Sequence, residues 1–105
     1  MKVGQIIKAK LGTAVNSRNE VGVCYEAYRE GNRAGWGIIF EDGGYDGFSP
    51  EEVRKFLVVS DHIDQTLKNY EFTSVLRLRD DYARGLFSNA FELGTLWKNG
   101  FDIAE

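Results

Sequence analysis

Hydrophobic and polar residues alternate in short runs through the first sixty positions, and glycine-rich or polar segments separate the runs. Such alternation is typical of β-strands that bury one face. In residues 21–28 it divides the side chains between two faces, one set being Val21, Val23, Tyr25 and Ala27 and the other Cys24, Glu26 and Tyr28. We predict five strands, over residues 3–10, 21–28, 36–41, 45–48 and 56–59, with a hairpin loop at 29–34.

Seven apolar residues of this part of the chain are expected to be largely buried, namely Ile7, Val23, Ile38, Phe40, Val53, Leu57 and Val59. Between the fourth and fifth strands, Ser49-Pro50-Glu51-Glu52 carries the signal of a helix start. Ser49 can accept a hydrogen bond from the first turn, proline is tolerated at the first helical position, and Glu52 can return a bond to Ser49. The order of residues therefore predicts a helical turn that begins after Ser49.

The pattern changes after residue 60, where apolar residues recur at helical spacing. We predict a helix from about Thr73 to Arg84, ended by Gly85 and carrying the i,i+4 pairs Arg77/Asp81 and Asp80/Arg84. The chain beyond it is too apolar to be solvated, since it contains Phe87, Phe91, Leu93, Leu96, Trp97, Phe101 and Ile103. We expect this extension to pack on the sheet or on a second copy of the chain. Leu86, Phe87, Phe91 and Trp97, within residues 86–103, are the expected anchors of a homodimer or partner interface.

Five short strands with one helical turn between the fourth and the fifth is the order of SH3-like barrels, and residues 1–60 resemble the Tudor and KOW type. The resemblance rests on the runs Val21-Gly22-Val23, Ile39-Phe40-Glu41-Asp42-Gly43 and Phe48-Ser49-Pro50-Glu51-Glu52-Val53. It implies a mainly β fold with α, a five-stranded SH3-like β-barrel over 1–60 followed by a helical C-terminal extension over 61–105. SH3-like barrels include RNA, DNA, peptide and methylated-residue binders and some toxin nucleases, so the fold fixes no reaction.

Charge distinguishes between these possibilities. The 105 residues carry a net charge of −3, and positions 1–60 balance eight basic with eight acidic residues. A protein that depends on phosphate contacts usually shows a basic excess. A single cysteine excludes an intramolecular disulfide and a cysteine zinc cluster, and no apolar run approaches the roughly 20 residues of a membrane span. With no signal peptide in sight, we expect a cytoplasmic protein that does not bind membranes.

Aromatic residues and an acid at the ends of adjacent strands form the candidate binding site, Tyr28, Trp36, Tyr45, Asp46 and Phe48. Barrels that resemble Tudor domains hold methylated cations in an aromatic cage beside an acid, because ring faces and a negative charge both attract a cation. The alternative is that most of these rings pack inward as core. Tyr28 and Tyr45 are the two that we expect to be exposed.

We expect a non-catalytic binding or adaptor module with a protein or peptide partner, without metal or cofactor. The alternative is a nucleic-acid-binding barrel that uses Lys2, Lys8, Lys10, Arg18, Arg29 and Arg33 together with Tyr28. The third possibility is a toxin-like nuclease. Cys24 and His62 are the only thiol and the only imidazole, and they lie far apart in the sequence, so neither is assigned a catalytic role.

Overall fold

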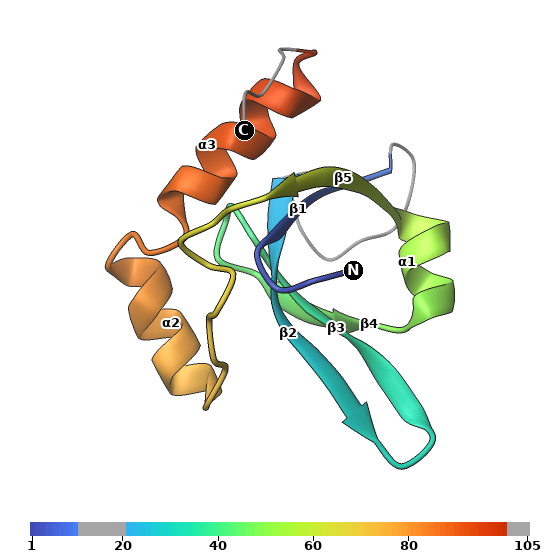
Figure 1. Ribbon diagram of the computed structural model, residues 1–105. Coiled ribbons are helices and arrows are strands. Elements are labelled where there is room, and N and C mark those ends of the chain that lie inside the picture. Colours follow the sequence, from blue (N-terminus) through green and yellow to red (C-terminus); the bar gives the residue numbers. More distant parts are fainter. Residues whose placement is uncertain (11–20, 101–105) are drawn as a thin grey trace.

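The computed structural model describes residues 1–10 and 21–100, which form a five-stranded antiparallel sheet and three helices (Figure 1). The fold is mixed, mainly β with α. The elements in chain order are β1 (Gln5–Ala9), β2 (Val21–Glu30), β3 (Arg33–Phe40), β4 (Tyr45–Phe48), α1 (Pro50–Phe56), β5 (Leu57–Ile63), α2 (Val75–Ala83) and α3 (Ser88–Lys98). No helix in this described part is long and apolar enough to cross a membrane. Arg18, Phe101 and Ile103, named above, lie outside the described residues.

The strands lie in the order β4-β3-β2-β1-β5 and every neighbouring pair is antiparallel. β2 and β3 form a long hairpin whose last pair is Glu30 with Arg33, so the loop consists of Gly31 and Asn32 alone. Gly31 has a φ of +58°, a conformation that a two-residue hairpin loop commonly needs and that glycine adopts at little cost. The predicted loop at 29–34 is therefore mostly strand. The fifth strand also differs from the prediction, because Phe56 ends α1 and pairing with β1 extends β5 to Ile63.

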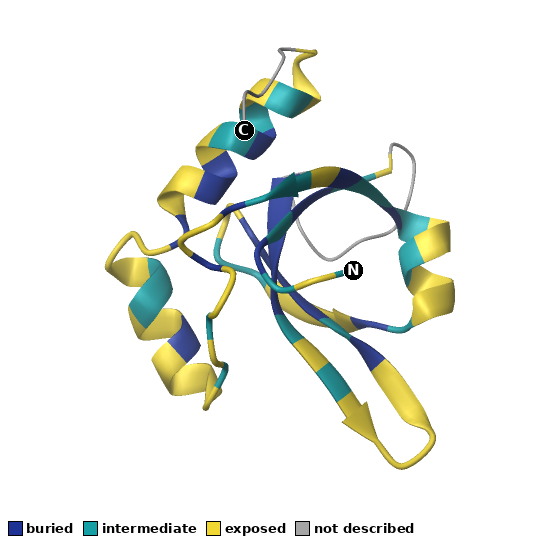
Figure 2. Cartoon of the chain, in the orientation of Figure 1, coloured by how far each residue is buried: buried dark blue, intermediate teal, exposed yellow. Residues whose placement is uncertain are grey.

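Each face of the sheet buries a hydrophobic cluster. Buried residues are spread along the strands and α3 (Figure 2). The inner cluster lies on the face towards α1 and consists of Ile7, Cys24, Ile38, Phe40, Phe48 and Leu57, with Val53 and Val59 half-buried against it. The helix-side cluster joins sheet residues Ile6, Val21, Val23, Tyr25 and Ile39 to Leu67, Leu78, Phe87, Ala90 and Phe91 from the C-terminal half. Burial is confirmed for five of the seven predicted core residues, and the other two, Val53 and Val59, are only partly covered.

The Ser49 cap is confirmed in both directions. Ser49 Oγ accepts a hydrogen bond from the Glu52 backbone N–H at 3.2 Å, and Glu52 Oε1 accepts one from the Ser49 N–H at 3.0 Å. Pro50 is the first residue of the helix, where its missing N–H leaves no bond unmade. The cap thus fixes where the chain leaves β4 and enters α1.

The helices of the C-terminal half cover the second face of the sheet. Ser74 caps α2, and the ion pairs Arg77–Asp81 (3.6 Å) and Asp80–Arg84 (3.0 Å) confirm the predicted i,i+4 pairs. Gly85, with a φ of +82°, follows the helix.

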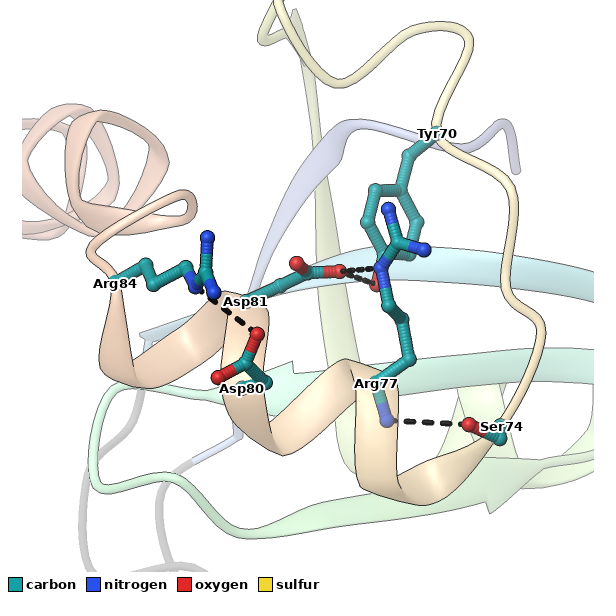
Figure 3. A network of polar contacts seen from close by, with 6 residues as sticks. All are labelled: Tyr70, Ser74, Arg77, Asp80, Asp81 and Arg84. Atoms are coloured by element: carbon teal, nitrogen blue, oxygen red, sulfur yellow. Dashed lines mark hydrogen bonds and ion pairs between the residues drawn. The ribbon is translucent and has the colours of Figure 1, made fainter.

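Asp81 also accepts a 2.7 Å hydrogen bond from the Tyr70 hydroxyl, which ties the segment before α2 to that helix (Figure 3).

The aromatic rings that we expected at an interface between two copies pack inside a single chain. Phe87 and Phe91 are buried in the helix-side cluster, at 1% and 7% exposure. Trp97 is half-buried and packs against the same cluster, with Lys8 Nζ 5.1 Å from its ring centre. Leu86 remains exposed. The assignment of Phe87 and Phe91 to a partner interface is therefore wrong, because the sheet's own apolar second face takes them.

A β-bulge in β2 changes the two faces predicted for that strand. Cys24 pairs with Ile38 and Glu26 with Gly37, so Tyr25 is an extra residue opposite Gly37. Beyond the bulge, Tyr28 pairs with Gly35, which shares its face with Gly37 and Ile39 of the helix-side cluster. The prediction that Tyr28 shares the face of Cys24 is therefore wrong. The absence of a side chain at Gly37 makes room for the Tyr25 ring, since a Cβ there would lie 2.5 Å from it.

Candidate binding surface

The structure divides the predicted aromatic site between the two faces of the sheet. Phe48 is buried in the inner cluster, where its ring meets that of Phe40 edge to face at 6.2 Å, and Trp36 packs half-buried against the same cluster. Tyr45 is exposed and pairs with Ile39, so it belongs to the opposite face. These rings therefore do not line one cage. Their role in binding stays a prediction for Tyr28 and Tyr45, which share a face, whereas Phe48 serves the core.

Asp46, the acid of the predicted site, lies exposed on the edge strand β4. Its Oδ1 accepts a hydrogen bond from the Gly47 backbone N–H at 2.8 Å. Asp46 pairs with Ile38 of the inner cluster, so alternation places its side chain on the face opposite Tyr45. The acid thus protects the free edge of β4 rather than facing the two tyrosines.

Tyr28 lies across two glycines of neighbouring strands. A Cβ at Gly35 would lie 2.6 Å from the Tyr28 hydroxyl oxygen, and one at Gly47 would lie 3.2 Å from it. Real Cβ atoms do not approach other atoms as closely as the first distance, so Gly35 must lack a side chain for the ring to lie there. The half-buried phenol thus lies in the space that these two glycines leave open on β3 and β4.

A groove of about 660 Å³ lies between the β2–β3 hairpin and the start of α1, with Tyr28 in its wall. Arg33 comes from the hairpin and Arg54 from α1, while Glu51 and Glu52 come from the first turn of α1. Two positive and two negative groups therefore surround an aromatic and proline-containing surface. We name this the hairpin groove; it is lined by Tyr28, Asn32, Arg33, Ala34, Gly47, Ser49, Pro50, Glu51, Glu52 and Arg54.

The basic residues of the nucleic-acid alternative are dispersed. Lys8 lies beside Trp97 under α3, and Lys10 Nζ donates a hydrogen bond to the Arg54 carbonyl at the far end of the sheet. Arg29 and Arg33 are exposed near the hairpin tip, and Lys2 is exposed near the N-terminus. The described members of this set form no continuous basic strip.

Cys24 is held as an inert thiol. Its Sγ–H donates to the Glu26 carbonyl at 3.3 Å, and burial raises the pKa of the thiol to about 11. The thiolate is the nucleophilic form of cysteine, and at neutral pH it is scarce here. His62 lies half-buried in β5 with its backbone N–H bonded to Ser60 Oγ. Among the described residues, no three His, Cys, Asp or Glu side chains gather as metal ligands.

A second cleft, of about 330 Å³, was missed by the sequence reasoning. It lies between β2, with Tyr25 and Glu26, and the segment before α2, with Tyr70, Glu71 and Phe72. The rings of Tyr25 and Phe72 meet at 5.2 Å. Burial, followed by the charge of Glu26, raises the pKa of Tyr25 to about 12, and burial raises that of Glu26. We name this the β2 cleft; only the high density of tyrosine, phenylalanine and glutamate around 70–72 hints at it in the sequence.

Comparisons with known proteins do not identify a function, so the functional argument rests on the fold and on the two surfaces described above. No protein-family model matches the chain, and no curated protein and no solved structure shows significant similarity to it.

Proposed function

We propose that this protein is a non-catalytic binding module built on an SH3-like barrel of the Tudor or KOW type, with a protein or peptide as its partner. The strand order β4-β3-β2-β1-β5 supports the fold assignment, as does the helix α1 between β4 and β5. In Figure 1, α1 lies at the open end of the sheet between these two strands. The C-terminal helices then serve as a cover for the other face.

The hairpin groove carries the proposal. Its wall contains one tyrosine that lies over two glycines, and a tyrosine side chain, which has only two χ angles, loses little entropy on binding. Around the tyrosine stand Arg33 and Arg54 against Glu51 and Glu52. This balanced set suits a peptide that presents both signs of charge next to an apolar residue.

The same charges disfavour the alternatives. A nucleic acid presents only negative charge, and the two glutamates of the groove would repel it while the arginines attract it. A nuclease reaction would find no cysteine nucleophile here, because burial raises the pKa of the Cys24 thiol, the only thiol in the sequence, to about 11 and it stays protonated at neutral pH. We therefore rank a peptide partner above a nucleic acid and above a nuclease reaction.

Selection from a displayed library of random peptides, followed by fluorescence anisotropy with the selected peptides, tests this function. We expect Arg33→Glu to weaken binding by about tenfold or more, since it reverses a charge in the groove wall. Arg79→Glu is the matched control, because Arg79 is exposed on α2, away from the groove, and makes the same change in net charge.

A second titration uses double-stranded DNA and single-stranded RNA at physiological salt. Submicromolar affinity with a steep salt dependence would promote the nucleic-acid alternative. Failure of the library to yield any peptide that discriminates Arg33→Glu from Arg79→Glu would remove the hairpin groove as the binding site.

A further inference from the structure

The outer half of β2 has an unpaired edge. β1 pairs with β2 from Val21 to Val23 and the Gly4 N–H donates to the Cys24 carbonyl at 2.8 Å, whereas beyond Cys24 β2 continues to Glu30 beside β3 alone. Figure 2 shows this outer part of the hairpin as largely exposed. Because the two-residue loop makes Glu30 and Arg33 a hydrogen-bonded pair, the backbone N–H and C=O groups of Ala27 and Arg29 point away from β3. Within the described part of the chain, no other group pairs with them.

The edge strand β4 protects its outer side. Asp46 Oδ1 accepts a hydrogen bond from the outward N–H of Gly47 at 2.8 Å. Side chains that occupy edge donors hinder pairing with another chain. At Ala27 and Arg29 the edge of β2 carries no such protection.

A preformed cleft accompanies the open edge. The β2 cleft is bounded by Tyr25, Glu26 and Ala27 on the strand, and by Glu71 and Phe72 on the facing segment. The hydrogen bond from the Tyr70 hydroxyl to Asp81 anchors that segment to α2, as Figure 3 shows. A site that is already ordered pays less entropy when a ligand enters. The cleft can therefore receive an extended chain without first rearranging its wall.

Charge identifies the occupant. Glu26, Glu30 and Glu71 stand along the edge and cleft, where three acids outnumber two bases, Arg29 on the edge and Arg33 opposite Glu30. Burial, followed by the charge of Glu30, raises the pKa of Glu26. We propose that the outer half of β2 binds an extended, lysine- or arginine-containing peptide by adding it as a strand beside Ala27 and Arg29. A second copy of this edge would bring the same acids together. The inference rests on the proposed function of a peptide-binding module and assigns it a second surface, distinct from the hairpin groove.

The test uses a capped heptapeptide of alternating lysine and valine, titrated into the full chain and followed by amide NMR. Strand addition predicts that hydrogen exchange at the Ala27 and Arg29 amides slows by about tenfold or more when the peptide is bound. A version of the peptide that is N-methylated at every central residue keeps the charge but cannot pair, and it should give no protection.

Charge-matched variants complete the test. Glu26→Gln with Glu71→Gln should weaken binding by about fivefold or more, whereas Asp61→Asn with Glu92→Gln, which removes two exposed acids elsewhere, should change it little. Binding without protection of Ala27 and Arg29, or no binding at millimolar peptide, overturns strand addition. Neither outcome touches the hairpin groove, whose own test uses library-selected peptides and Arg33→Glu. Protection that appears without peptide and rises with protein concentration would assign the edge to a second copy and also refute the proposal.

Discussion

Gly94 of α3 sets how closely that helix approaches the sheet, and replacing it with alanine measures the contact. A Cβ at Gly94 would lie 2.3 Å from Val21 Cγ1 and 3.1 Å from Ile6 Cγ2. Val21 and Ile6 are both fully buried, and a β-branched side chain on a strand has few other rotamers. The helix must therefore move outward by about 1 Å to reach ordinary contact distance.

The expected change in the free energy of unfolding on Gly94→Ala is the sum of two opposing contributions. Overpacking of a core typically costs about 1 to 3 kcal/mol, and alanine in place of glycine within a helix returns about 1 kcal/mol. Because the new Cβ would lie so close to Val21 and Val21 has few other rotamers, the overpacking cost should lie towards the upper end of its range. Gly94→Ala should therefore lower the free energy of unfolding by about 1 to 2 kcal/mol, and Tm by about 4 °C for each kcal/mol.

Urea denaturation followed by tryptophan fluorescence measures this change, and a double-mutant cycle with Val21→Ala isolates its cause. Removing the Val21 methyl groups leaves Val21 Cβ at 3.5 Å and Ile6 Cγ2 at 3.1 Å from the new Cβ, distances that a small shift accommodates. In that background Gly94→Ala should be neutral or stabilising by up to about 1 kcal/mol. The reasoning is refuted if Gly94→Ala is as stable as the parent, or if its effect is the same in both backgrounds.

Three further predictions concern stability. Ser49→Ala should cost about 0.5 to 2 kcal/mol in a urea titration, because it leaves the Glu52 N–H without its cap; an unchanged midpoint would contradict this. Phe40→Ala should cost about 3 to 5 kcal/mol by the same assay, since the ring is 2% exposed, and a loss below that of a surface substitution would show that the site collapses. The raised pKa of Tyr25, from 10.0 to about 12, means that the folded state holds this proton more tightly, so the stability it contributes is complete below pH 10 and is lost as pH rises to about 12. Tyr25→Phe should flatten the fall in unfolding free energy over that interval, and parallel curves would refute the assignment.

Local signals in the sequence predicted much of the first sixty residues. Ser49 and Glu52 lie three residues apart and satisfy each other, so their hydrogen bonds depend on little beyond the helix start itself. The period-two pattern likewise located β2, and the glycine-rich turn at residues 42–44 located the start of β4. These features are decided within a few residues of chain.

The sequence did not predict features that depend on a residue in another strand or helix. The bulge at Tyr25 requires a glycine opposite it, and that glycine is Gly37 on β3. Without the bulge in view, strict alternation assigns Tyr28 to the wrong face. The close approach of α3 depends in the same way on Gly94 meeting Val21.

The candidate surfaces show the same limit. The predicted site took aromatic residues from adjacent strands, but Phe48 and Trp36 were needed to fill the inner cluster. The β2 cleft combines Tyr25 with Phe72, and no pattern along the chain relates residues so far apart. Residue types alone could not decide which aromatic ring is buried and which can meet a ligand.

The sheet order also has a consequence for the sequence of folding events. β2 and β3 are joined by two residues and can pair early, whereas β1 pairs with β5 through Gln5 and Ile63, at opposite ends of the sheet-forming region. Such distant pairing must wait for the intervening chain to be ordered. During synthesis, a chain that ends at β5 can form the β2–β3 hairpin and the sheet. The apolar second face of that sheet stays exposed to water until α3 is made and Phe91 packs onto it.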